Sequence, residues 1–361
     1  MVYIGVFLLT ILLSFFTQYC IRRKKKNLFL ILLMFITILP LCILAGLRDT
    51  SIGTDTEVYL IPWFERALRS DYSSYISLVS GERGFYTLVY FSSLLSSSTF
   101  LLFFIVELSI LFPLMISAYI YREQVDFRIY IFVLCLLLYN DTLCYMRQFI
   151  AGAFLVLAFV LLTKKHYIWS FIFFGLSPFF HTTAIYLIAI IIIVYTLKNK
   201  YLLMLIVIAY FLVVFFSRQV VDNVYKIGII DDKYYNSFLQ YSTDVNANFF
   251  DIIIWFVFFM SPFIFYKNGA FENRSDRTLI VLSLFGIIST FGMLLSGYFF
   301  RITFYSRIFI PIIFGVFLNK VHVEEKYINV KIIAYLFLII IFWMYFYPYL
   351  NYANTFPYVF A

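Results

Sequence analysis

Charged residues are scarce in this sequence: Asp, Glu, Lys and Arg make up 13% of its 361 residues, against roughly 25% in soluble proteins. Hydrophobic residues reach 64%, well above the roughly 45–50% of soluble chains. This balance excludes an ordinary soluble domain. Apolar stretches of roughly 17 to 23 residues recur, and each is long enough to cross a ~30 Å hydrocarbon layer as a helix. The sequence therefore predicts an all-α polytopic membrane protein.

Several patterns that carry chemistry in other proteins are missing. The four cysteines show no paired spacing and mostly lie in apolar runs, which argues against a disulfide framework or a metal cluster. There is no glycine-rich phosphate loop, no His-Glu-x-x-His and no Gly-x-Ser-x-Gly, so nucleotide-driven and hydrolase chemistry lose support. We expect no cofactor. The net charge of +8 does not indicate a nucleic-acid partner, because the basic residues sit in short loops that orient a membrane protein.

The order of apolar runs and basic loops predicts a topology. The consecutive cations Arg22–Lys26 follow the first apolar run, which places their loop in the cytoplasm and the N-terminus outside. The remaining pattern predicts about 12 transmembrane helices, with both termini outside, in one integral membrane domain of residues 1–361. Two longer polar segments, 48–83 and 218–248, are the predicted external loops. The run 84–95 is too short to cross and predicts a re-entrant or interfacial helix.

Ionisable groups concentrate in the stretch Gly46–Tyr59, which holds one arginine, three carboxylates and a glycine turn. Charges beside a bilayer are costly unless they are solvated or functional. We therefore interpret this stretch as one wall of an external site. The other walls are expected to come from ionisable residues that the topology places on the same side of the membrane: Glu82, Arg147, His181, Arg301 and Arg307.

Four arginines carry the prediction of an anionic ligand. Arg147, followed by Gln148, begins a helix whose next turn has small residues, so its guanidinium faces a packed crevice or else extends to lipid headgroups. Arg48 ends an outward span and either contacts the ligand or pairs with a nearby carboxylate. Arg301 and Arg307 lie roughly 120° apart on an ideal helix and share a site only if the turn between them is irregular. Planar guanidinium groups favour a phosphorylated or pyrophosphorylated lipid.

Acid–base chemistry has three candidates. His181 lies at an outer turn and is a phosphate donor, a proton shuttle near neutral pH, or a packing residue. Asp55 and Glu82 are candidate general bases. Asp55-x-Glu57 also has an acidic spacing that can hold a divalent cation, although arginines near a leaving pyrophosphate make a metal unnecessary.

Taken in order, these pieces resemble the EpsG-type members of the Wzy polysaccharide polymerases. The resemblance covers about residues 46 to 310 and rests on the following segments: Gly46-Leu-Arg48-Asp49…Gly53-Thr54-Asp55…Tyr59, Glu82-Arg-Gly84-Phe85, Met146-Arg147-Gln148…Ala151, Phe180-His181-Thr-Thr-Ala184 and Arg301…Tyr305…Arg307. The chain departs from the family pattern at Arg83 and at Thr182-Thr183. The segment 218–248 has no counterpart that we can align.

The resemblance implies a glycosyltransferase of the bacterial cytoplasmic (inner) membrane. Such an enzyme joins oligosaccharide repeat units carried on undecaprenyl pyrophosphate into O-antigen or exopolysaccharide at the periplasmic face. Membrane lipid and a chain-length regulator protein are the other candidate partners. We assign Arg48, Arg147, Gln148, Arg301 and Arg307 to the pyrophosphate. Asp55, Glu82 or His181 takes the acceptor proton. The alternatives are a flippase for the lipid-linked oligosaccharide and a lipid-linked polysaccharide ligase, which share the need for outer arginines.

Overall fold

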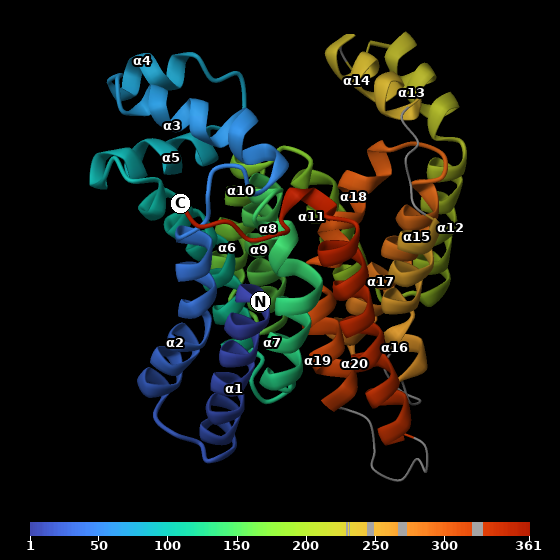
Figure 1. Ribbon diagram of the computed structural model, residues 1–361. Helices are drawn as coiled ribbons and strands as arrows, with labels where there is room; N and C mark the ends of the chain where they lie inside the picture. Colours follow the sequence, from blue (N-terminus) through green and yellow to red (C-terminus); the bar gives the residue numbers. More distant parts are fainter. Residues whose placement is uncertain (229, 231, 244–248, 266–272, 320–327) are drawn as a thin grey trace. The chain divides into compact units, whose positions relative to one another are not determined.

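The computed structural model describes residues 1–228, 230, 232–243, 249–265, 273–319 and 328–361 (Figure 1). Throughout these residues the chain is helical, apart from turns and an isolated antiparallel bridge between Arg48 and Phe360. The chain divides into two compact units: unit 1 comprises Met1–Ile185 and Phe314–Ala361, and unit 2 comprises Tyr186–Ile313. The units are described separately below. That the chain is a single integral membrane domain stays a prediction.

Unit 1 holds the N-terminal half of the chain and its last helices. Its helices are α1 (Val2–Arg22), α2 (Asn27–Gly46), α3 (Ile61–Ala67), α4 (Tyr72–Ser77), α5 (Arg83–Leu95), α6 (Thr99–Ile120), α7 (Phe127–Val133), α8 (Tyr139–Thr142), α9 (Met146–Thr163), α10 (Tyr167–Phe180) and α20 (Ile328–Met344). Three π-helical turns add to them: η1 (Thr56–Leu60), η2 (Leu134–Leu138) and η3 (Tyr345–Tyr349). A short 3₁₀ turn, η4, covers Tyr352–Asn354.

Unit 2 is built around one long helix. Its helices are α12 (Lys200–Phe215), α13 (Ser217–Lys226), α14 (Asp232–Thr243), α15 (Phe249–Phe259), α16 (Ser261–Ile264), α17 (Arg274–Gly292) and α18 (Tyr298–Arg307). Two further helices, α11 (Ala184–Thr196) and α19 (Ile310–Asn319), begin in one unit and end in the other. Helix α17 packs against α12, α15 and α18. Gly286 allows this closeness, since a Cβ there would lie 2.5 Å from the ring of Phe259.

Seven helices of the described residues are long and apolar enough to cross a membrane, or eight if the bent pair α12 and α13 forms one span. Helices α10, α11 and α15 are apolar but shorter. The chain is therefore a multi-pass membrane protein, as predicted. The count of about 12 crossings and the side on which the termini lie stay predictions.

Side-chain contacts show which loops lie together at each end of the helix bundle in unit 1. At one end, Arg22 of α1 lies 3.7 Å from Asp126, before α7, and Tyr121 donates to Thr163 Oγ1 at 2.6 Å. At the other end, the Tyr3 hydroxyl donates to the carbonyl of Thr355 at 2.7 Å. Figure 1 shows α3, α4 and α5 at the end opposite the α1–α2 loop. The loops around Arg22 and Asp126 thus share one end, which agrees with an α5 that does not cross.

Both predicted external loops are partly helical. Segment 48–83 contains η1, α3 and α4, and segment 218–248 contains most of α13 and all of α14. The polar composition of both segments predicted loops, but short amphipathic helices form there and pack on adjacent helices. Residues 229, 231 and 244–248 of the second segment lie outside the described part of the chain. The same holds for residues 266–272 and 320–327.

Helix α9 is the centre of unit 1. It packs against α6 and α10, and its small residues Ala151, Ala153 and Ala158 are fully buried. Small side chains let helix backbones approach closely within a bilayer. The first turn of α9, which carries Arg147, is therefore held rigidly beside the ends of its neighbours.

Candidate functional site

Glu82 is the meeting point of three segments that are far apart in the sequence. Its Oε2 accepts a hydrogen bond from Nη1 of Arg147, at the start of α9, at 2.6 Å. Its Oε1 is bonded to Nδ1 of His181, in the turn after α10. The backbone N–H of Thr182 also approaches Oε1, at 3.4 Å. The side chains of Glu82, Arg147 and His181 are 12%, 25% and 13% exposed. We call these three residues the Glu82 cluster.

The charges of the cluster favour an ionised carboxylate. Burial by itself would raise the pKa of Glu82, but the hydrogen bond from His181 and the charges of His181 and Arg147 lower that pKa below its usual value. A carboxylate with a lowered pKa is a weak base. Glu82 is therefore better suited to orienting His181 and Arg147 than to removing a proton from a substrate.

Two backbone features fix Glu82 in place. Glu82 itself adopts φ +54°, ψ +36° as the N-cap of α5, a left-handed conformation that a non-glycine residue adopts at some cost and that occurs often at functional sites. Two residues later, Gly84 packs on the end of α10, where a Cβ would lie 3.0 Å from the carbonyl oxygen of Phe179. The absence of a side chain at Gly84 lets the start of α5 reach His181.

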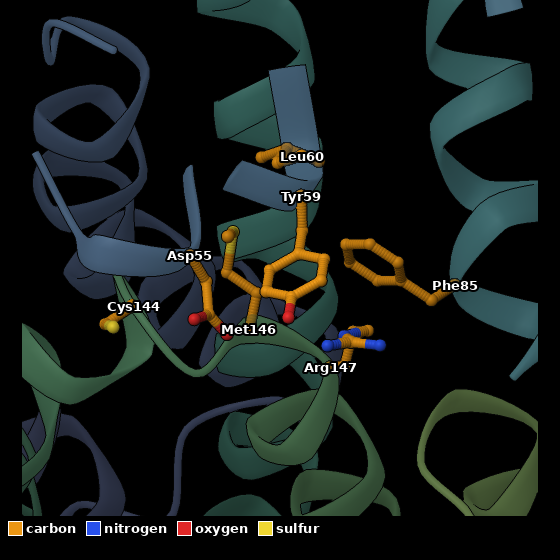
Figure 2. Close-up of a pocket in the computed structure, with 7 residues that line it drawn as sticks. All are labelled: Asp55, Tyr59, Leu60, Phe85, Cys144, Met146 and Arg147. Carbon is orange, nitrogen blue, oxygen red and sulfur yellow. The ribbon is translucent and has the colours of Figure 1, made fainter. Parts of the chain in front are cut away.

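A small recess lies against the cluster. It holds about 180 Å³ of space, including its open mouth, and is lined by Asp55, Tyr59, Leu60, Phe85, Cys144, Met146 and Arg147. Figure 2 shows Asp55 and Arg147 reaching into it from different segments, with the Tyr59 ring between them. The Arg147 guanidinium carbon is 5.1 Å from the centre of that ring. Of the predicted site residues, the structure thus brings Asp55, Glu82, Arg147 and His181 to one place.

Comparison with known proteins now identifies the family. The family model described as the EpsG family matches residues 31–360, nearly the whole chain. The chain belongs to the EpsG family. Searches of curated proteins and of solved structures gave no match. Membership in this glycosyltransferase-like polymerase family indicates a polymerase-type role in exopolysaccharide or O-antigen synthesis.

Arg48 of this EpsG-family chain points inward and is 2% exposed. Its Nη1 donates to the carbonyl of Leu143 at 2.7 Å, and its guanidinium carbon lies 4.4 Å from the centre of the Phe103 ring. Gly53 packs on the same carbonyl, since a Cβ at Gly53 would lie 2.5 Å from it, and has φ +89°. The structure therefore places Arg48 behind the recess, where it ties the end of α2 to the segment before α9. Its assignment to pyrophosphate stays a prediction.

The two remaining arginines belong to unit 2. Arg301 and Arg307 both lie in α18, which is helical from Tyr298 to Arg307, so the irregular turn that would let them share a site does not lie between them. Arg307 is 1% exposed, lies 3.5 Å from Oδ2 of Asp251, and stacks 4.0 Å from the centre of Trp255. On a regular helix the two guanidinium groups point in different directions. A pyrophosphate contact from either one stays a prediction.

Gln148 and Glu57 are also placed by the structure. Gln148 is 7% exposed within α9. Glu57 is exposed on η1, whereas Asp55 lines the recess. Among the described residues, no group of three or more His, Cys, Asp or Glu side chains gathers as metal ligands do.

Sequence reasoning missed the polar residues of α8. Asn140 Nδ2 donates to Thr355 Oγ1 at 3.1 Å, and Asn140 Oδ1 accepts from Trp343 Nε1 at 2.9 Å. Thr142 donates to Glu107 of α6 at 2.9 Å. The α8 side chains thereby join the helices on either side, and they precede Arg147 by only a few residues. Three consecutive polar residues, Asn140-Asp-Thr142, between apolar runs were the signal that could have indicated this role.

Proposed function

We propose that this EpsG-family protein joins oligosaccharide repeat units, carried on undecaprenyl pyrophosphate, into O-antigen or exopolysaccharide at the outer face of the bacterial cytoplasmic membrane. The Glu82 cluster is the observation that carries this proposal. A carboxylate that holds Nδ1 of a histidine fixes the ring so that Nε2 exchanges the proton. An arginine on the same carboxylate places a positive charge beside that proton transfer.

The reaction assigns a role to each member of the cluster. In its neutral form, with Nδ1–H on Glu82, His181 takes the proton from a hydroxyl of the acceptor sugar at Nε2, and that oxygen attacks the anomeric carbon of the donor unit. The bond from the anomeric carbon to the phosphate oxygen breaks, and undecaprenyl pyrophosphate leaves with the electron pair. Arg147 uses guanidinium donors that Glu82 does not occupy to neutralise the leaving group. The glycosyl phosphate bond supplies the energy, so no nucleotide is required.

The position of the cluster supports an outward-facing site. It lies at the end of unit 1 where α5 packs, opposite the loop that carries the cations following Arg22. Basic loops mark the cytoplasmic side. A flippase would need charged groups reachable from both faces, whereas Glu82, Arg147 and His181 meet at one end only. A ligase would share this arrangement and is distinguished by its product.

Substitution of His181 tests the proposal, with His166 as the matched control. The two histidines lie at opposite ends of α10, and His166 is exposed next to Lys164 and Lys165. We expect His181→Ala to reduce the surface polysaccharide ladder on a gel to a single repeat unit, and His166→Ala to leave the ladder unchanged. Loss of even the single unit would indicate a flippase instead. Polymer that accumulates on its lipid carrier would indicate a ligase. A normal ladder in His181→Ala would refute the assignment of the proton acceptor.

A further inference from the structure

Helix α5 has an apolar face that the other described residues of unit 1 leave exposed. Its buried side consists of Phe85, Tyr86, Val89 and Tyr90, which pack towards α3, α6 and α10. On the other side Phe91, Leu94 and Leu95 are 56%, 62% and 70% exposed. Tyr72 of α4 extends this surface, since its ring stacks on Phe91 with centroids 6.3 Å apart. We call Tyr72, Phe91, Leu94 and Leu95 the α5 apolar face.

The connection to α6 fixes the level of this face relative to the bilayer. Only Ser96, Ser97 and Ser98 separate α5 from α6, so Leu95 lies within about 14 Å of Thr99, by the maximum reach of an extended chain. Helix α6 has 22 residues, or about 33 Å, which matches the ~30 Å hydrocarbon layer. Its first residue therefore lies near one surface of the bilayer. The end of α5 must lie near the same surface.

Helix α5 cannot itself continue into the membrane as a span. Its 13 residues extend only about 20 Å, and Ser96 turns the chain in an extended conformation, φ −164° and ψ 148°. Figure 1 shows α5 lying across the direction of α6. A short helix that lies across a span, with one buried face and one exposed apolar face, has the character of an interfacial helix.

Only residues 96–98 separate the α5 apolar face from α6, a helix with exposed apolar residues of its own. Phe100, in the first turn of α6, is 37% exposed, and its ring packs on Gly46 at the end of α2, where a Cβ would lie 2.7 Å away. Ile43 and Leu47 at the same end of α2 are also exposed. Both α2 and α6 are long and apolar enough to cross a membrane, so we expect their exposed apolar residues to contact acyl chains. The simplest occupant of the neighbouring α5 face is the same lipid.

We propose that the α5 apolar face lies in the lipid interface of the membrane and holds the Glu82 cluster at the depth of the headgroup phosphates. Glu82 is the N-cap of α5, so the depth and tilt of this helix determine where the carboxylate lies. The second part of this inference rests on the proposed function: a lipid-linked pyrophosphate then reaches Arg147 while its isoprenoid chain stays in the bilayer.

Site-directed spin labelling in liposomes tests the position of the helix without any measurement of activity. Labels are attached to Phe91→Cys and Leu95→Cys. References are Leu12→Cys, at an exposed site within the span α1, and Ser73→Cys, at an exposed polar site on α4. The four native cysteines are buried and are replaced by alanine only if they label. We expect the labels at positions 91 and 95 to collide more often with oxygen than with a water-soluble nickel chelate, as the label at position 12 does. Their depth below the membrane surface should be roughly 5–10 Å.

The proposal is overturned if the labels at 91 and 95 behave like the label at 73. It is equally overturned if both are shielded from oxygen and nickel chelate alike, because a second protein surface would then cover the face. For the functional part, Leu95→Asp should reduce polymer yield at least tenfold, whereas Leu95→Phe should retain it. A lipid-embedded label combined with normal polymer in Leu95→Asp would overturn the depth argument and leave the proposed reaction intact.

Discussion

Replacing Glu82 by glutamine separates the orienting role of this residue from its size. Glutamine keeps the shape of the side chain but offers one carbonyl oxygen, whereas the carboxylate accepts from Arg147 at 2.6 Å with one oxygen and bonds His181 with the other. The variant can keep both partners only if its amide N–H donates to Nδ1 of His181, which places the ring proton on Nε2. In that tautomer Nε2 can no longer take a proton from the acceptor sugar, so the proposed reaction is lost even if the contacts are kept.

The expected magnitudes follow from these contacts. A hydrogen bond to a charged group contributes roughly 1.5–3 kcal/mol, and the partial exposure of Arg147, 25%, reduces that figure through solvent screening. We expect Glu82→Gln to lower the free energy of unfolding by about 1–2 kcal/mol. Misplacing a general base typically costs about 10²–10⁴ in rate. Polymer formation should therefore fall roughly 100-fold or more, far beyond what so small a loss of stability explains.

The pH dependence of stability provides a second readout. Burial raises the pKa of Glu82, but the hydrogen bond from His181 and the charges of His181 and Arg147 lower it more, so the folded-state pKa lies below the usual value. Stabilisation by Glu82 is then fully present above the ordinary carboxyl pKa of about 4.3 and is lost as the pH falls through the lower folded value. The difference in melting temperature between wild type and Glu82→Gln should shrink as the pH falls below about 4.

The assay uses purified protein in liposomes with lipid-linked repeat units, polymer being resolved on a gel, alongside thermal unfolding in detergent. Glu65→Gln is the matched control, because Glu65 is an exposed carboxylate on α3 in the same polar segment, and we expect it to change neither readout. The reasoning fails if Glu82→Gln makes polymer at the wild-type rate while its melting temperature is lowered. That result would mean that the ion pair serves stability alone.

Three further predictions concern packing and buried charge. Gly84→Ala should destabilise the protein by about 1–3 kcal/mol and shorten the polymer, whereas Gly81→Ala, where a Cβ meets nothing within 4 Å, should do neither; equal melting temperatures would contradict this. Arg48→Met should lower stability by about 1–3 kcal/mol, because it leaves the buried carbonyl of Leu143 without its donor, and a stable but inactive Arg48→Met would show that Arg48 contacts substrate instead. Asn140→Ala should cost about 1–3 kcal/mol by leaving the Trp343 N–H without its acceptor; an unchanged unfolding midpoint in detergent would rule this out.

The long helices could be predicted from the sequence because the thickness of a bilayer sets their length. The apolar run that follows Arg147 forms α9, whose 18 residues are long enough to cross a membrane. The residues Glu82, Arg147 and His181 could be chosen because ionisable groups are rare beside apolar runs. That they meet was an inference from topology, and their pairing through one carboxylate was not foreseeable, since it depends on contacts 65 and 99 residues apart.

The surroundings of each arginine could not be predicted from the sequence. The assignment of Arg48 to an external anion stays a prediction; in the structure its buried guanidinium lies against the carbonyl of Leu143 and the ring of Phe103. Whether the segment between Arg301 and Arg307 is irregular was left open, and the structure shows the regular helix α18. In both cases an aromatic ring packs on the guanidinium of a buried arginine, and no local sequence pattern marks that environment.

The segment near residue 50 depends on residues made much later. Asn354 donates to the carbonyl of Ser51, 303 residues away in sequence, Gly53 donates to the carbonyl of Asn354, and Asp49 donates to that of Val359. At about 5–20 residues per second of synthesis, roughly 15 to 60 seconds pass before these partners emerge from the ribosome. During biogenesis the segment near residue 50, which borders the recess, is therefore among the last parts to reach its final conformation, well after most spans have entered the bilayer. Fusion tags or truncations near the carboxyl end should thus impair maturation of the site while leaving membrane insertion unaffected.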